Sequence, residues 1–188
     1  NDLAFLSQHI VKHRDHISID QNVAIGEMEE VKIPRGTPDD LKLDPYMHTE
    51  YRSKLGQINY FQNKTQLQAT FRFSRLASAA HSPTVKDLKE LNKLIRELKC
   101  NPVQLNLFKL TGPLRLIVIP DASYQNNTDG SSQRGLVICL AEQRKPNQTG
   151  TRGSLIEYES HKINRTTLNV TVAELYALLK GYGTGQWI

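Results

Sequence analysis

The sequence predicts an α+β fold in which a mostly helical N-terminal segment is followed by three antiparallel strands and a final helix. Two observations support this prediction. From about residue 51 to residue 98, apolar residues recur three and four residues apart, which is helical spacing. Further on, short apolar runs of strand length alternate with turn residues. The pattern changes at Leu110–Pro113, which divides the chain into residues 1–112 and 113–188.

The N-terminal part is expected to hold one exposed strand and three helices. Apolar and polar residues alternate over His16–Asp20, as in a strand with one exposed face. Helices are expected at about 48–62 and 67–80, and a third begins after Thr84. This third helix is the best defined, because Thr84 and Asp87 have the spacing of a capping box. Its apolar stripe consists of Val85, Leu88, Leu91, Ile95 and Leu98.

The C-terminal part is expected to fold as three consecutive strands and one helix. The strands are predicted at 114–119, 135–140 and 154–160, and the first of them reads as buried. A turn at Asn126–Gly130 and a polar loop at Glu142–Gly153 connect them. The helix is predicted at 170–180 after Asn169, a good N-cap. It should pack on the sheet through Val172, Leu175, Tyr176 and Leu179, which lie on one face.

Composition and charge limit the class of protein. The 188 residues include 24 Lys and Arg against 19 Asp and Glu, a net charge of +5, which favours a polyanionic partner. No run of 18 apolar residues is present, so the sequence contains no membrane-spanning helix. The two cysteines, Cys100 and Cys139, suggest a reducing compartment rather than a disulfide scaffold. Because the chain does not begin with Met, we expect it to be a fragment of a longer protein.

Two acidic residues could carry chemistry. Asp121 follows the first predicted strand of the C-terminal part, and Glu174 lies inside the last helix. One carboxylate from a strand and one from a helix packed on it are what a two-metal phosphodiester hydrolase requires, with Mg²⁺ ions about 4 Å apart. From spacing alone, the alternative is that Asp121 opens a turn and Glu174 is a solvated helix residue.

Two groups of basic residues could contact phosphates. Lys86, Lys89, Lys93 and Arg96 form one stripe on the third helix, opposite its apolar face. Lys162 and Arg165 precede the last helix, whose N-terminus also favours phosphate. For both groups the alternative is an ordinary solvated surface.

Several segments carry recognisable motifs in a fixed order. They are Tyr51–Tyr60, Ser82–Thr84, Asp87–Lys93, Asp121–Asn127, Gly130–Gly135, Glu159–Arg165 and Ala173–Ala177. In this order they resemble the C-terminal part of the Pol polyprotein of copia-type LTR retrotransposons. The resemblance implies the end of a reverse transcriptase with its connection over residues 1–112. It implies the first half of a ribonuclease H-like domain over residues 113–188.

The resemblance also implies an activity, ligands and partners. The complete enzyme copies RNA to DNA and hydrolyses the RNA strand of RNA–DNA hybrids, with Asp121 and Glu174 as ligands of two Mg²⁺ ions. Ser123 and Tyr124 would line the groove that holds the hybrid. The implied partners are the hybrid and the rest of the Pol polyprotein, with no membrane. The implied location is the cytoplasm, in a virus-like particle, and the nucleus.

Departures from the family pattern leave a second interpretation open. The family's Pro-Asp turn is replaced at Thr65–Ala69, and its further acidic ligands would lie beyond Ile188. We therefore expect residues 1–188 alone to lack ribonuclease activity and to leave an unpaired edge on the first strand of the domain. The alternative is a decayed or host-adopted remnant that binds nucleic acid without catalysis.

Overall fold

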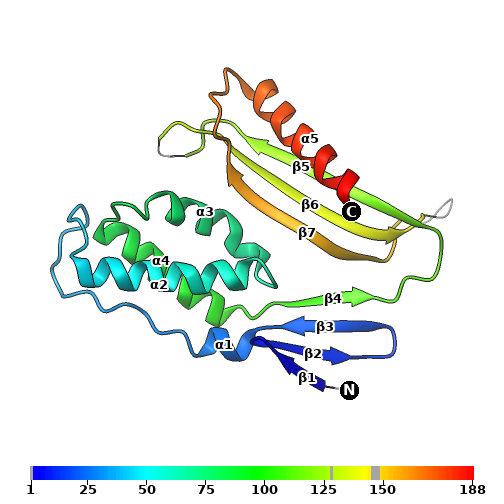
Figure 1. The fold of residues 1–188 in the computed structure, drawn as a ribbon, viewed down its shortest axis with the longest axis horizontal. Coiled ribbons are helices and arrows are strands. Elements are labelled where there is room, and N and C mark those ends of the chain that lie inside the picture. The colour runs from blue at the N-terminus through cyan, green and yellow to red at the C-terminus, as the bar shows by residue number, and fades with distance from the viewer. Residues whose placement is uncertain (1, 128, 145–148) are drawn as a thin grey trace. The chain divides into compact units, whose positions relative to one another are not determined.

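A computed structural model describes residues 2–127, 129–144 and 149–188 (Figure 1). Helices and antiparallel sheets are both present, as the predicted α+β class requires. The chain divides into two compact units. One consists of the N-terminal segment to Leu3, Ile10–Ile19 and Leu105–Ile188, and the other of Ala4–His9 and Asp20–Gln104.

Four short strands form the first sheet. They are β1 (Asp2–Phe5), β2 (Gln8–Lys12), β3 (His16–Asp20) and β4 (Gln104–Phe108), in the order β1-β2-β3-β4. The strand predicted at His16–Asp20 is confirmed, whereas the other three were not predicted. Leu6 and Ser7, which join β1 to β2, adopt positive φ angles of 47° and 59°. The Gly or Asn residue that usually marks such a two-residue turn is absent, so no local pattern predicted this hairpin.

The unit that contains Asp20–Gln104, which we call the helical unit, has four α-helices and one 3-10 turn. They are α1 (Asn22–Gly26), α2 (Pro45–Gln62), η1 (Leu67–Ala69), α3 (Thr70–Ser78) and α4 (Val85–Cys100). The three predicted helices correspond to α2, to η1 with α3, and to α4. The capping box of α4 is present, because the Thr84 N–H donates to Asp87 at 2.8 Å and the Asp87 N–H donates to Thr84 Oγ1 at 3.5 Å.

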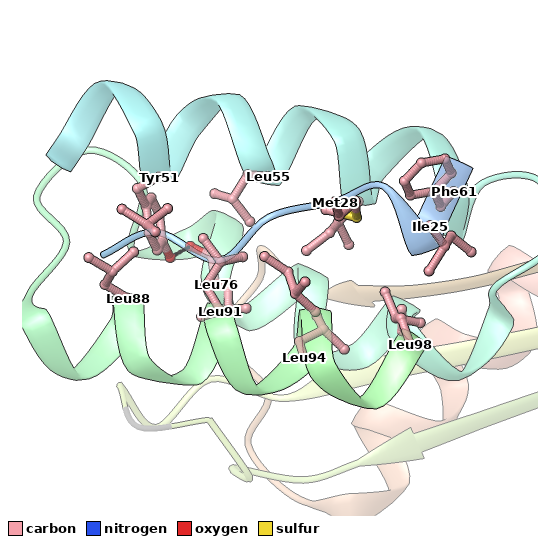
Figure 2. Close-up of a cluster of buried hydrophobic side chains, with 14 residues drawn as sticks. Ile25, Met28, Tyr51, Leu55, Phe61, Leu76, Leu88, Leu91, Leu94 and Leu98 are labelled. Carbon is pink, nitrogen blue, oxygen red and sulfur yellow. Dashed lines mark hydrogen bonds between the residues drawn. The ribbon is translucent and has the colours of Figure 1, made fainter. Parts of the chain in front are cut away.

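Large apolar side chains fill the core of this unit (Figure 2). The stripe predicted for α4 is buried along its whole length. Two polar side chains inside the core form hydrogen bonds with the backbone, and in the first the Tyr51 hydroxyl donates to the Leu76 carbonyl at 2.8 Å. The Asn92 amide both accepts from and donates to the backbone of Val31, at 2.9 and 2.8 Å. At Tyr51 and Asn92 the core therefore combines close apolar packing with satisfied hydrogen bonds.

A three-stranded antiparallel sheet forms the main part of the unit that contains Leu105–Ile188, which we call the sheet unit. Its strands are β5 (Leu114–Ser123), β6 (Gln133–Glu142) and β7 (Gly153–Lys162), in the order β5-β6-β7. All three predicted strands are confirmed, and each is longer than predicted. The predicted turn at Asn126–Gly130 includes Thr128, and the predicted loop at Glu142–Gly153 includes residues 145–148. These five residues lie outside the described part of the chain.

The first strand of this sheet is less buried than predicted. Within the three-stranded sheet β5 is an edge strand, and Leu114 and Ile119 are 50% and 54% exposed. The run of apolar residues suggested a strand covered on both sides, but only one face of β5 is covered. Pro120 continues the strand although it lacks an N–H group, a position that an edge strand tolerates.

Helix α5 (Val170–Trp187) packs on one face of this sheet, as Figure 1 shows. The packing face differs from the prediction, because Leu175 and Leu179 are 51% and 57% exposed. The buried residues of α5 are small: Ala173, Ala177 and Gly181. A Cβ atom built on Gly181 would lie 3.1 Å from Pro120 Cβ, so the backbone of the helix closely approaches β5. Large side chains do not fit into this contact, which explains the error.

Candidate functional site

Asp121 lies within β5, not after its end. It is directly opposite Gly135 in the register of β5 and β6, and it is exposed. A Cβ atom built on Gly135 would meet nothing within 4 Å, so the space beside Asp121 is open. The strand therefore holds an acidic side chain rigidly at a solvent-accessible position.

Glu174 lies in the second turn of α5 and is half-buried. Seven residues, nearly two turns, separate it from Gly181, so both residues lie on the side of the helix that faces β5. Gly185 lies against Leu116 and Val118, and Gly181 lies against Val118 and Pro120. The helix thus runs antiparallel to β5.

The two acids come to the same end of β5. A rise of 1.5 Å per residue places Glu174 about 10 Å beyond Gly181, which corresponds to roughly three strand residues beyond Val118–Pro120. Glu174 is therefore at about the level of Ala122, next to Asp121. Side chains alternate along a strand, so Asp121 leaves β5 on the face opposite to Pro120 and α5. The two acids therefore lie at the same end of β5, but on opposite faces of the sheet.

Polar side chains surround Asp121 on its own face of the sheet. The Gln133 amide donates to Ser160 Oγ at 2.9 Å, and Lys162 forms an ion pair with Asp129. Hydrogen bonds from Lys162 and from the Ser131 hydroxyl and N–H hold the pKa of Asp129 well below its usual range. The charge of Lys162 is thus partly compensated. The sequence analysis did not identify Gln133 and Ser160 as neighbours of Asp121, although they lie in the motif segments Gly130–Gly135 and Glu159–Arg165.

The other residues predicted beside the acids lie near the N-terminus of α5. The Tyr124 hydroxyl donates to the Leu168 carbonyl at 3.2 Å, and Ser123 is exposed at the end of β5. The Arg165 guanidinium lies 6.0 Å from the centre of the Tyr176 ring. The side chain of Asn169 accepts a hydrogen bond from the Val172 N–H at 3.0 Å, which confirms the predicted N-cap.

The basic stripe of α4 belongs to the helical unit and is partly neutralised there. Lys89 forms an ion pair with Asp39 at 2.5 Å, and Arg96 forms one with Glu30. Lys86 and Lys93 are exposed. Exposed ion pairs contribute little to stability, but each carboxylate lowers the positive potential of the stripe.

Among the residues that the structure describes, no three His, Cys, Asp or Glu side chains gather in a group that would hold a metal ion. The helices in the described ranges are also too short or too polar to cross a membrane. Comparisons with protein-family models, with curated proteins and with solved structures found no match.

Proposed function

We propose that the chain is part of a copia-type reverse transcriptase and ribonuclease H, which copies RNA to DNA and hydrolyses the RNA strand of RNA–DNA hybrids. The observation that carries this proposal is the position of Asp121 and Glu174 at one end of β5. On this proposal, residues 1–112 are the reverse transcriptase end and connection, and residues 113–188 belong to the ribonuclease H-like part. The protein then acts in a virus-like particle in the cytoplasm and in the nucleus.

The donor set near Asp121 fits Mg²⁺. Carboxylate oxygens are hard ligands that Mg²⁺ prefers, and Asp121 and Glu174 would hold it at the open edge of β5. When bound, the metal activates a water molecule and stabilises the leaving oxygen of the phosphodiester. The open space beside Gly135 leaves room for a ligand next to Asp121.

The surrounding residues of this unit suit a nucleic-acid backbone. Ser123 and Tyr124 follow Asp121 directly in the chain, and Lys162 reaches the same face of the sheet from β7. Arg165 adds a guanidinium near the N-terminus of α5. Recognition of a hybrid would rest on backbone geometry and 2′-OH contacts, which a polar and basic surface provides.

Thermal melts with and without Mg²⁺ test the proposal. Asp121→Asn and Glu174→Gln keep the side-chain size but remove a charge that repels its neighbour, so in metal-free buffer the Tm should stay the same or rise. Mg²⁺ should raise the Tm of the wild type by about 2–4 °C, because a ligand of the folded state stabilises it. Neither variant should show this response.

Glu157→Gln is the matched control, because Glu157 is an exposed acid of β7 in the same unit. It should respond to Mg²⁺ as the wild type does. An identical Mg²⁺ response in all four proteins would show that Asp121 and Glu174 are not metal ligands. Hybrid binding without any Mg²⁺ response would favour the non-catalytic interpretation.

A further inference from the structure

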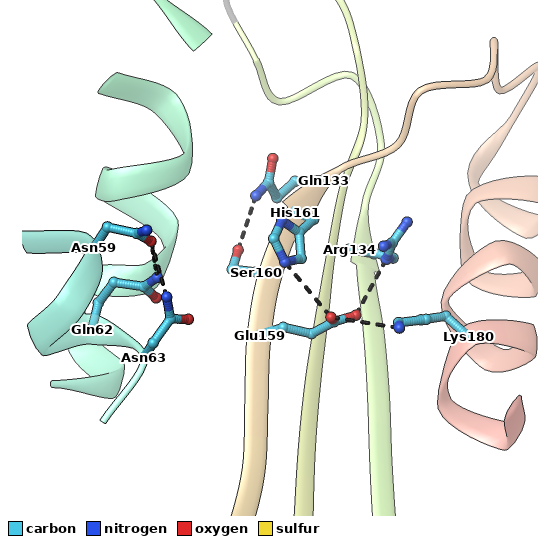
Figure 3. A network of polar contacts seen from close by, with 9 residues as sticks. All are labelled: Asn59, Gln62, Asn63, Gln133, Arg134, Glu159, Ser160, His161 and Lys180. Atoms are coloured by element: carbon cyan, nitrogen blue, oxygen red, sulfur yellow. Dashed lines mark hydrogen bonds and ion pairs between the residues drawn. The ribbon is translucent and has the colours of Figure 1, made fainter. Parts of the chain in front are cut away.

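A second charged cluster lies on the other face of the three-stranded sheet, beneath and beside α5 (Figure 3). Glu159 of β7 is its centre, and its side chain is only 17% exposed. Three basic groups reach this carboxylate: Arg134 Nε at 3.5 Å, His161 Nε2 at 3.6 Å and Lys180 Nζ at 3.7 Å. They come from β6, β7 and α5, so the fold itself brings them together.

Taken by itself, the group of Glu159, Arg134, His161 and Lys180 has more positive than negative charge, and Glu157 lies further along the same face of β7. Arg134 and Lys180 are both charged at neutral pH, and Glu159 can balance one of them. Each cation also has more hydrogen-bond donors than one carboxylate uses, five for an Arg and three for a Lys. The Lys180 side chain is 40% exposed and that of His161 is 58% exposed. An anion from solvent can therefore reach donors that Glu159 leaves available.

The positive charge continues along α5 toward its N-terminus. Tyr176 lies one helical turn before Lys180, and the Arg165 guanidinium lies over its ring. Arg134 and His161 are directly opposite each other in the register of β6 and β7. We refer to Arg134, His161, Arg165 and Lys180 as the cationic band.

We propose that the cationic band binds the phosphates of a nucleic-acid backbone, with Glu159 as the residue that positions its cations. The proposal deepens the function proposed above and rests on it for the identity of the nucleic acid. A nucleic acid suits the band because its phosphates are closely and regularly spaced, so that one backbone can meet cations from β6, β7 and α5 together. The band is separate from Asp121, which leaves the sheet on the opposite face, whereas Glu174 lies on the same face as the band.

Fluorescence anisotropy with a labelled RNA–DNA hybrid, measured over a range of salt concentrations, tests the proposal. The double variant Arg134→Gln/Lys180→Gln should weaken binding by about 10-fold near physiological salt and reduce the salt slope by about 2. Glu159→Gln removes a repulsive charge and should tighten binding by about 3-fold. The control Lys109→Gln/Arg115→Gln removes the same charge from exposed positions of the same unit and should change binding far less.

The outcomes separate this proposal from the preceding one. If the double variant binds as its control does, or if polyglutamate competes as well as unlabelled hybrid, the cationic band is not a nucleic-acid site. If the double variant fails to fold, the single variant Lys180→Gln, which changes a residue on the surface of α5, replaces it in the test. This single variant should lower the salt slope of hybrid binding by about 1. Weak binding by the double variant together with an absent Mg²⁺ effect at Asp121 would support the band and refute the metal site.

Discussion

The helices α4 and α5 bury opposite kinds of residue. In the helical unit, α4 presents Leu88, Leu91 and Ile95 to the core, all fully buried, and keeps its charged residues outside. In the sheet unit, α5 buries alanine and glycine, and its leucines remain more than half exposed. The difference shows that burial follows the distance between packed elements, not the size of the apolar side chain alone.

The physical reason lies in what each helix packs against. Helices such as α2, α3 and α4 are separated by the side chains that interdigitate between them, so large residues fill the contact. The backbone of α5 instead approaches β5 closely, with a glycine at each of two successive contacts, Gly181 and Gly185. A large side chain at either position would push the helix away from the sheet.

The largest effect should come from truncating a buried leucine of α4. Leu91→Ala should lower the free energy of unfolding by about 3 kcal/mol, through lost burial and the cavity that remains. Leu179→Ala makes the same chemical change on α5, where the side chain is 57% exposed, and should change it by less than about 0.5 kcal/mol. Urea denaturation followed by circular dichroism measures both, and equal losses would contradict the comparison.

A smaller effect is expected from enlarging the residue at the close contact. Gly181→Val should destabilise the sheet unit by about 2 kcal/mol, because the added methyl groups overlap Pro120 and Val118. Gly183→Val is the control on the same helix, since a Cβ atom there meets nothing within 4 Å. The difference between the two midpoints in urea isolates the steric effect from the helix propensity of valine. No difference would show that α5 can shift away from β5 without loss.

Sequence patterns predicted those elements whose signals are local. The capping box at Thr84 and the stripe of α4 depend on residues close together in the chain, and both are confirmed. Strands β1 and β2 are short and are joined by a turn without the usual turn residues, and β4 pairs with β3, which is distant in the chain, so no local pattern revealed these strands. The face of α5 was predicted wrongly because this helix is apolar on most sides. A period of 3.6 residues cannot then distinguish one face from another.

The candidate site shows the same limit. The motifs drew attention to Asp121 and Glu174, and the structure brings both to one end of β5. The sequence alone could not show whether the Asp121 side chain and α5 lie on the same face of β5, because the sequence does not show which face of the sheet the helix covers. The cluster around Glu159 joins residues of three elements, and only the register of β6 and β7 reveals it.

The smallest effect is expected from removing the hydroxyl of one buried tyrosine in each unit. The Tyr51 hydroxyl donates to the Leu76 carbonyl, whereas the Tyr158 hydroxyl is buried with no hydrogen-bond partner within the described ranges. Tyr51→Phe should therefore cost about 1 kcal/mol at pH 7, because a buried carbonyl loses its donor. Tyr158→Phe should be neutral or slightly stabilising, because it removes an unsatisfied polar group. A loss of stability in Tyr158→Phe as large as that in Tyr51→Phe would contradict this reading.

The same two phenols should make the protein sensitive to alkali. Burial raises the pKa of Tyr51 and that of Tyr158 well above the ordinary value of 10.0. Above pH 10 the unfolded chain therefore releases protons that the folded protein keeps, so stability falls with rising pH, by about 1.4 kcal/mol per pH unit for each phenol. Phenylalanine cannot ionise, so the stability difference between wild type and Tyr51→Phe should shrink from pH 9 to pH 11. Over the same range Tyr158→Phe should become more stable than the wild type. Urea midpoints at these two pH values measure the change, and a constant difference for both variants would show that neither phenol is kept protonated by burial.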